Sequence, residues 1–400
     1  MRRSSVFVLL AVAAVLALVG PATASVTVDD PLWEHQWGPR QVHADQSWDT
    51  STGSGAVIAI VDSGVDRDHE DLAANVVGGN TFIDCGETGC GNGDWESGED
   101  GGHPHGTHVA GIAAAVTGNA TGIAGVAPDA DIMPVKVLDQ SGSGSFQDIG
   151  YGIRWAADNG ADVINLSLGA YPGVQALELT GVISDAKDAI AYARSKGVVV
   201  VAAAGNEAFP LCSSPSFNDG ALCVVATDKR EAQPWYSNDA IKPDLLAVAA
   251  PGGAGVYAAC YEEVVSTVPP GEGGDYCGYP SNLAYDEYAG TSMAAPHASG
   301  VAGLLAAVGC TDQQILDAMT STARNPVTGA RGTWDPVYGY GIVDADDALA
   351  AASCGGTTAS ETTTDGDASS DSGDGDGHGR PDDPGNGNGK EANRRDAQAA

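Results

Sequence analysis

Three near-continuous apolar runs constrain the fold of this chain more than any other feature. They occupy residues 56–61, 162–166 and 198–203, and each ends at a polar or glycine-rich segment. Short apolar runs that alternate with helical stretches are typical of strands buried on both faces of a parallel sheet. This alternation, which extends over residues 28–350, therefore predicts an α/β fold with a mostly parallel sheet covered by helices.

The carboxyl ends of these runs mark where chemistry is expected. In open α/β sheets, ligands bind outside the carboxyl ends of the strands. The residues at those ends are Asp62, Ser167-Leu168-Gly169 and Gly205-Asn206. The pattern predicts a site along one edge of the sheet before any motif is considered.

The composition excludes several classes of partner. The chain has 53 acidic and 18 basic side chains, and its formal net charge is −35. Such a charge repels nucleic acid and anionic lipid, so neither nucleic acid nor a membrane is expected as a partner. Of the acidic residues 39 are Asp, and only six of the basic residues are Lys. We interpret this Asp-rich, Lys-poor composition as a halophilic adaptation, because high salt screens the repulsion between the acidic side chains. Separately, we expect the protein to be a monomer.

Both ends differ in composition from the body of the chain. Residues 1–24 combine two arginines, an apolar run and small residues, which is typical of a secretory signal peptide. The arginine pair leaves a twin-arginine export route open. Residues 355–400 contain no large apolar side chain and predict a disordered acidic tail rich in Gly, Asp, Ser and Thr. We expect a secreted, extracellular protein with its folded domain at residues 25–354.

The eight cysteines agree with export to an oxidising compartment. None has the Cys-x-x-Cys spacing of a zinc site, so disulfides are the better interpretation. Eight cysteines allow 105 pairings, and short loops favour nearest neighbours without deciding the connectivity. The nearest-neighbour pairs are Cys85/Cys90, Cys212/Cys223, Cys260/Cys277 and Cys310/Cys354.

Three residue types needed for nucleophilic catalysis occur in separate motifs. Asp62 lies at a strand end, His105 at the glycine-rich start of a helix, and Ser292 within Gly-Thr-Ser-Met-Ala-Ala-Pro-His at residues 290–297. A serine hydroxyl is a poor nucleophile until a histidine accepts its proton, and the histidine needs a carboxylate that fixes its tautomer. Each residue alone is weak evidence, but together they form a sufficient set.

These motifs resemble those of subtilisin-like serine proteases, the peptidase S8 or subtilase family. The matching segments are Ala-Ile-Val-Asp-Ser-Gly-Val at residues 59–65, His-Gly-Thr-His-Val-Ala-Gly at 105–111 and the serine segment, in the family's order. Residues 36–39 and 339–345 are most similar to the thermitase-like branch. The resemblance implies a subtilisin-like three-layer α/β fold with a mostly parallel central sheet flanked by helices.

The resemblance also implies a role for each motif residue. Ser292 is implied as the nucleophile, His105 as the general base and acid, and Asp62 as the carboxylate that orients His105. His108 is the competing base, but the family motif places the catalytic histidine first in His-Gly-Thr-His. Asn206 matches the family residue that donates to the oxyanion, together with the backbone N–H of Ser292.

Substrate is expected to bind as an extended strand held through its backbone, which tolerates many side chains. The pocket beside the third apolar run looks roomy and apolar and favours large hydrophobic residues before the cut, while Glu207 could add tolerance for basic ones. The resemblance assigns substrate binding to Gly142, Ser143, Gly144, Ser167, Leu168, Gly169, Ala203, Ala204 and Gly205.

Calcium is the cofactor that the resemblance implies. Carboxylate, amide and backbone oxygens converge at the family's strong calcium site, and the matching residues are Asp71, Asn119, Thr121 and Ile123. The segment Asn119-Ala120-Thr121 also fits a glycosylation sequon, although burial around calcium argues against its use.

Two further acidic segments are weaker calcium candidates. In a chain this acidic, four carboxylates in one loop are also expected as solvated surface. The Asp-Gly-Asp-Gly run at residues 374–377 lacks the rest of a calcium loop and favours a solvated tail. The carboxylates of the first segment are Asp94, Glu96, Glu99 and Asp100.

Taken together, these features predict a secreted serine endopeptidase of broad specificity, which hydrolyses peptide bonds in proteins through an acyl-enzyme on Ser292. One alternative is a catalytically silent binding protein that retains the scaffold. The intact set of Asp62, His105, Ser292 and Asn206 weighs against it, because a silent scaffold has no chemical need for all four. The other alternative is a maturation protease that cuts a single partner, which a narrow cleavage motif would favour.

Overall fold

The structure is a computed structural model. It describes residues 26–83, 95–97, 103–174, 184–242, 245–255, 259–273, 277, 284–354 and, as backbone, 396–399. The predicted signal peptide and most of the predicted tail lie outside the described residues.

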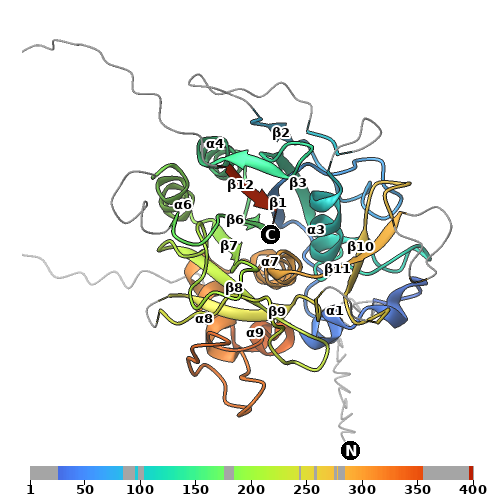
Figure 1. The fold of residues 1–400 in the computed structure, drawn as a ribbon. Coiled ribbons are helices and arrows are strands. Elements are labelled where there is room, and N and C mark those ends of the chain that lie inside the picture. The colour runs from blue at the N-terminus through green and yellow to red at the C-terminus, as the bar shows by residue number, and fades with distance from the viewer. Residues whose placement is uncertain are drawn as a thin grey trace, which may run out of the picture.

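A seven-stranded parallel sheet forms the middle of the molecule (Figure 1). All neighbouring strands in it pair in parallel, as the sequence predicts. The strands, in spatial order, are β2 (Asn80–Thr81), β3 (Asp131–Lys136), β1 (Val57–Asp62), β5 (Val163–Leu166), β7 (Val199–Ala203), β8 (Ala221–Thr227) and β9 (Ala247–Pro251). The three predicted runs become β1, β5 and β7, each within one residue of its expected ends.

The alternation of side chains along the strands places buried apolar clusters on both faces of the sheet. Ile58 and Ile60 of β1 face a cluster that includes α3 (His105–Ala114), α7 (Thr291–Ala307), α8 (Asp312–Thr322) and α9 (Ala345–Ala351). Ala59 and Val61 face a second cluster that includes α4 (Phe146–Asp158) and α6 (Asp185–Ser195). Because both faces of the sheet are buried, the strand sequences are continuously apolar and do not alternate between apolar and polar residues. The predicted three-layer α/β architecture is confirmed.

Side chains at the helix starts explain several helix boundaries. Ser145 accepts a hydrogen bond from the backbone of Asp148 and caps α4. Thr311 and Gln314 form a reciprocal capping box at the start of α8. Such caps satisfy N–H groups that have no partner within the helix.

Short elements complete the described part of the chain. β10 and β11 form an antiparallel pair, and β12 lies between β4 and β6 in a small separate sheet. Their bounds are η1 (Trp33–His35), α1 (Gly38–Gln41), α2 (Ala44–Ser47), β4 (Ser143–Ser145), β6 (Leu168–Gly169), β10 (Val264–Thr267), β11 (Tyr285–Tyr288) and β12 (Asp396–Ala399).

Three of the four nearest-neighbour disulfides are present: Cys212–Cys223, Cys260–Cys277 and Cys310–Cys354. The fourth expected pair, Cys85/Cys90, lies outside the described residues. No helix in the described ranges is both long and apolar enough to cross a membrane.

Candidate active site

The site begins where the order of the strands reverses. From β1 the chain continues to β2 and β3 on one side of the sheet, and β5 lies on the other side. Such a reversal leaves a crevice at the carboxyl ends of the strands. Asp62 is the last residue of β1 and is fully buried there. The strand-end prediction thus locates a carboxylate at the crevice.

Asp62 and His105 form a direct pair. Nδ1 of His105, the first residue of α3, lies 2.8 Å from Oδ1 of Asp62. Oδ1 also accepts a hydrogen bond from the backbone N–H of Ser63. Because the carboxylate accepts the proton on Nδ1, the neutral ring presents the lone pair of Nε2. Nε2 is buried and has no hydrogen-bond partner among the described residues.

Glycine at position 106 permits this pair to form. A Cβ at this position would lie 2.2 Å from the backbone oxygen of Gly64 and 3.2 Å from Oδ1 of Asp62. The backbone N–H of Gly106 donates to Oγ of Ser63, which joins the helix start to the end of β1. The start of α3 can approach Asp62 only because residue 106 has no side chain.

Ser292 is the second residue of α7, where backbone N–H groups lack partners within the helix. Its Oγ donates to the backbone oxygen of Ser167 at 3.2 Å, at the carboxyl end of β5. α3 and α7 pack against each other in the same core, so two of the three predicted residues lie at the starts of neighbouring helices.

A buried polar network holds the start of α7 against β5. The Oγ of Ser167 donates to the backbone oxygen of Ser292 at 2.7 Å and accepts from Nδ2 of Asn165 at 2.9 Å. Ser299, two turns along α7, donates to Oδ1 of Asn165 at 2.8 Å. Sequence reasoning gave Asn165 and Ser299 no role, although an Asn in the middle of an apolar strand is a signal that could have found the network.

Asn206 follows the end of β7, as predicted. Its Oδ1 accepts from the backbone N–H of Thr291 at 2.9 Å and from Oγ1 of the same residue at 3.1 Å. With the oxygen occupied in this way, the Nδ2 group is left as a donor beside the N–H groups at the start of α7. Gly205 has a φ of +106°, and a Cβ there would lie 2.4 Å from Nδ2 of Asn238. The turn therefore requires glycine.

The predicted substrate-binding residues lie on two strand edges and at one strand end. β4 contains Ser143 and Gly144, and Gly142 precedes it with a φ of +73°. β6 contains Leu168 and Gly169 and directly follows Ser167. Both strands pair antiparallel with β12, which lies between them. The remaining predicted residues, Ala203, Ala204 and Gly205, are buried at the end of β7.

Comparison of the sequence with models of known protein families identifies the family of this chain. The model of the subtilase family matches residues 53–341. The chain belongs to the subtilase family. It is therefore a serine endopeptidase, a hydrolase, and the predicted family is confirmed.

Individual relatives narrow the position of this subtilase within its family. Thermitase of Thermoactinomyces vulgaris is 41% identical over 77% of the chain and 95% of its own length. A thermophilic serine proteinase of Bacillus sp. strain AK1 is 38% identical over 82% of the chain and 70% of its own length. Halolysin of Haloferax mediterranei is 38% identical over 71% of the chain and 48% of its own length. The expected thermitase-like branch is confirmed.

A solved structure supports the fold. A protease from Pseudoalteromonas arctica PAMC 21717 superposes on 82% of this subtilase and on all of its own chain. The TM-score is 0.66 at 35% sequence identity. The subtilisin-like fold expected from the motifs is confirmed.

His108, the competing base, lies in the apolar interior of the subtilase. Burial lowers its pKa to about 3, with a further contribution from nearby His105. Its ring stacks on Tyr288 with 4.2 Å between the centroids, and Nε2 lies 3.2 Å from the backbone oxygen of Asp286. His297 is also buried, and its pKa falls to about 4 for the same reason. Both geometries are those of packed, neutral histidines.

The predicted calcium residues converge around Asp71. Its carboxylate accepts from Nδ2 of Asn119 and from the backbone N–H of Ile123, both at 2.8 Å. The backbone N–H of Thr121 donates to Oδ1 of Asn119. Burial raises the pKa of Asp71 to about 7 despite these hydrogen bonds.

Asp30 is an additional carboxylate that sequence reasoning missed. It is buried and accepts from the backbone N–H groups of Gly118 and Asn119, in the same loop. Burial raises its pKa, and its charge contributes to the raised pKa of Asp71. Neither carboxylate forms an ion pair with any described residue. The carboxylates of Asp30 and Asp71 and the amide oxygen of Asn119 are oxygen ligands of the kind that suits a hard cation such as calcium.

The second calcium candidate is only partly described. Glu96 forms an ion pair with Arg67 and a backbone bridge with Val65. The other three carboxylates, Asp94, Glu99 and Asp100, lie outside the described residues. Glu96 is thus engaged with a cationic side chain.

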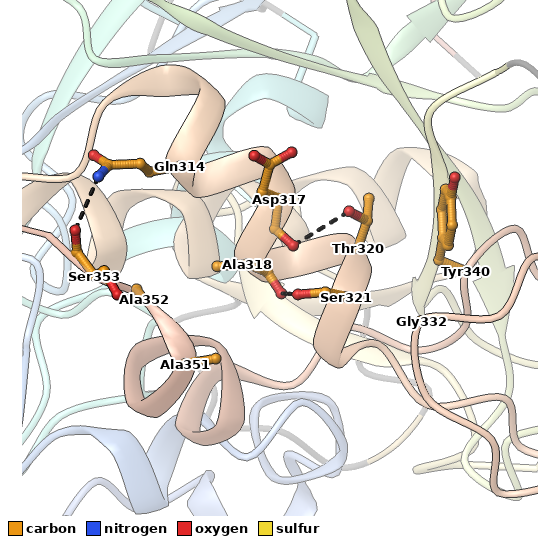
Figure 2. A pocket seen from close by; sticks show the side chains of 10 residues that line it. All are labelled: Gln314, Asp317, Ala318, Thr320, Ser321, Gly332, Tyr340, Ala351, Ala352 and Ser353. Carbon is orange, nitrogen blue, oxygen red and sulfur yellow. Dashed lines mark hydrogen bonds between the residues drawn. The ribbon is translucent and has the colours of Figure 1, made fainter.

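A separate open groove of about 430 Å³ lies between α8 and the carboxyl end of α9 (Figure 2). Gln314 of α8 donates to the backbone oxygen of Ser353 across it. Its lining contains none of the predicted catalytic, substrate-binding or metal residues. The lining residues are Gln314, Asp317, Ala318, Thr320, Ser321, Gly332, Tyr340, Ala351, Ala352 and Ser353.

Proposed function

We propose that Asp62, His105 and Ser292 form the catalytic triad of this serine endopeptidase. The observation that carries the assignment is the 2.8 Å contact between Asp62 Oδ1 and His105 Nδ1, which leaves Nε2 available as a base. In the first step Nε2 accepts the proton of Ser292 Oγ while the oxygen attacks the peptide carbonyl. Asp62 stabilises the imidazolium that forms.

The protonated His105 then delivers its proton to the leaving amine, and the acyl group remains on Ser292. Water enters, loses a proton to Nε2 and attacks the ester, which releases the acid and restores the serine. We infer that Asn206 Nδ2 and the backbone N–H of Ser292 donate to the oxyanion in both steps. The bonds from Thr291 to Asn206 Oδ1 support this role, because they occupy the amide oxygen and leave Nδ2 as the donating group.

We infer broad specificity from the way substrate would be held. The short strands β4 and β6 would bind substrate through its backbone N–H and C=O groups, which are the same in every peptide. Ala203, Ala204 and Gly205 have small side chains or none, which favours a large apolar substrate residue before the cut. Glu207 could also add tolerance for a basic substrate residue. Its carboxylate already accepts hydrogen bonds from Ser213 and Asn238, and a basic residue would be a further partner.

We infer that calcium stabilises the protein at the Asp71 loop. Asp71, Asn119 and the backbone of Thr121 and Ile123 would hold it, with Asp30 as a further carboxylate. The raised pKa values of both buried carboxylates support this role, because a bound cation offsets the cost of their charge. Calcium would supply charge compensation and rigidity, with no part in the bond cleavage.

We propose that the enzyme is secreted and works in high salt as a monomer on proteins and peptides. A signal at residues 1–24, a folded domain at 25–354 and a tail at 355–400 fit this proposal. Three disulfides, and relatives that include an extracellular protease and halolysin, support export and salt adaptation. The net charge of −35 argues against nucleic-acid and membrane partners.

An activity-based probe tests the triad directly. The purified protein should be labelled by an alkyl fluorophosphonate and should digest casein in low and multimolar salt. Ser292→Ala should abolish both signals without loss of fold, as judged by circular dichroism. The assignment would be overturned if the probe labelled a residue other than Ser292, or if the folded, unmutated protein were not labelled at all.

A further inference from the structure

A segment near the end of the chain lies between the two strands proposed to hold substrate. β12 pairs antiparallel with β4 on one side, with Asp396 opposite Ser145 and Ala397 opposite Gly144. On the other side Gln398 lies opposite Gly169 and Ala399 opposite Leu168. In Figure 1, β12 is the red arrow close to β6, with which it pairs. The strand order β4-β12-β6 is that of a peptide inserted into a cleft.

The register points this segment toward the nucleophile. Successive residues of β12 move along β6 from Gly169 to Leu168, toward Ser167. The backbone oxygen of Ser167 accepts the hydrogen bond from Oγ of Ser292. A residue that continued this register by one position would lie opposite Ser167, next to the attacking oxygen. The segment therefore has the direction of a substrate whose bond to be cut follows β12.

The connection to the folded body is long enough to reach the cleft. Cys354 is joined to Cys310, so the connecting segment starts just beyond the carboxyl end of α7. α7 has 17 residues and is thus about 25 Å long, with Ser292 at its other end. The sequence places 41 residues, 355–395, between Cys354 and β12, and a chain of that length can reach up to about 140 Å, well beyond the length of α7. The tether can therefore cover the distance without strain.

We propose that residues 396–399 bind in the substrate cleft of their own chain and inhibit it competitively. This inference rests on the proposed function, because it takes β4 and β6 as the walls of the substrate cleft. A tether of this length gives the segment an effective concentration of about 1 mM. If the segment alone binds with a Kd of about 0.1 to 1 mM, molecules with an empty cleft are at most as numerous as molecules whose cleft holds the segment. The apparent KM then rises by about 2- to 10-fold.

Proline substitution tests the proposal in the full-length protein. Ala397→Pro removes a backbone donor from a strand that has neighbours on both sides, which a sheet does not tolerate. Its apparent KM for a short chromogenic peptide should fall by about 2- to 10-fold, with kcat per labelled active site unchanged. The matched control is Ala392→Pro, four residues before β12, which should behave as the unmutated protein.

The mode of inhibition is tested by dilution and by addition of the segment. Inhibition within one chain should not change with enzyme concentration, and a synthetic peptide of residues 393–399 should restore a higher KM to Ala397→Pro. An equal KM in Ala397→Pro and the unmutated protein would overturn the proposal, as would inhibition that disappears on dilution. If no variant hydrolyses peptide or takes the fluorophosphonate, the proposed triad fails instead, so the two failures are distinct.

Discussion

At the scale of single residues, the site depends on what is missing as much as on what is present. The contact between Asp62 and His105 requires the start of α3 to approach the end of β1 closely. Gly106 has no Cβ to block this approach. The proposed catalytic pair is thus positioned by a residue that has no part in the proposed chemistry.

The first prediction concerns that approach. In Gly106→Ala the new Cβ would lie 2.2 Å from the backbone oxygen of Gly64, so the helix start must move away from Asp62. We expect a loss of about 1 to 3 kcal/mol in the free energy of unfolding, as for other overpacked sites, together with a large fall in kcat. Urea unfolding in a Ser292→Ala background and peptide hydrolysis measure the two effects.

Gly78→Ala is the matched control for this substitution. A Cβ at residue 78 would have no heavy atom within 4 Å. The control should leave both quantities unchanged. Full activity in Gly106→Ala would show that the approach of α3 tolerates a side chain.

The second prediction concerns the oxyanion. Asn206→Ala removes the Nδ2 donor, and kcat should fall by about 10²- to 10³-fold, the range known for the equivalent donor in subtilisin. KM should change little, because the donor acts mainly on charge that develops in the transition state. Steady-state kinetics on a peptide amide give both values. Asn159→Ala, at the exposed end of α4, is the control, and a fall of less than tenfold in Asn206→Ala would contradict the role.

At the scale of elements, the network through Asn165 joins β5 to α7, the helix that contains the proposed nucleophile. Its three bonds connect β5, the segment after it and two turns of α7. Buried networks of this kind are rigid only while every member has its partner. The position of Ser292 thus depends on residues remote from substrate.

The third prediction follows from this network. Ser299→Ala leaves Oδ1 of Asn165 buried without its donor, which should cost about 1 to 3 kcal/mol of unfolding free energy. Urea unfolding of inactive Ser292→Ala protein measures it without self-digestion. Ser321→Ala, on the exposed side of α8, is the control and should change stability by less than about 0.5 kcal/mol. Equal stability of the two variants would exclude the network as a source of rigidity.

The elements were more predictable from the sequence than the contacts between them. β1, β5 and β7 followed from apolar runs because a strand buried on both faces has a local signature. Asp62, His105 and Asn206 were found because they lie at element ends within long motifs. Asp30 and Asn165 were missed because their partners, Gly118 and Ser299, are distant in sequence, and a single Asp or Asn carries no sign of its partner.

At the scale of the whole molecule, buried acidic charge links stability to cations and pH. Burial holds the pKa of Asp71 at about 7, above its usual value of 3.8. Between these values the folded state binds a proton that the unfolded state has released, so this group's contribution to stability falls as pH rises from about 4 to 7. A bound cation removes that penalty by compensating the charge.

The fourth prediction uses this linkage in the Ser292→Ala background. With a chelator at pH 8, the free energy of unfolding should be lower than in calcium by about 3 kcal/mol when calcium is at 100 times its Kd. At pH 5 the difference should shrink, because protons compete for Asp71. Asp71→Asn should abolish the calcium response. Equal stability with calcium and with chelator at pH 8 would contradict a site at this loop.

The substrate cleft proposed between β4 and β6 has a further consequence for the lifetime of the enzyme. Because its walls are strand edges, it accepts only chain that is free to become extended, whatever the sequence. A folded copy of the same protein offers little such chain, but an unfolded copy offers every bond. In a concentrated solution the survival of each molecule would then be governed by how often it opens, so that disulfides and bound cations act as determinants of resistance to digestion by its neighbours.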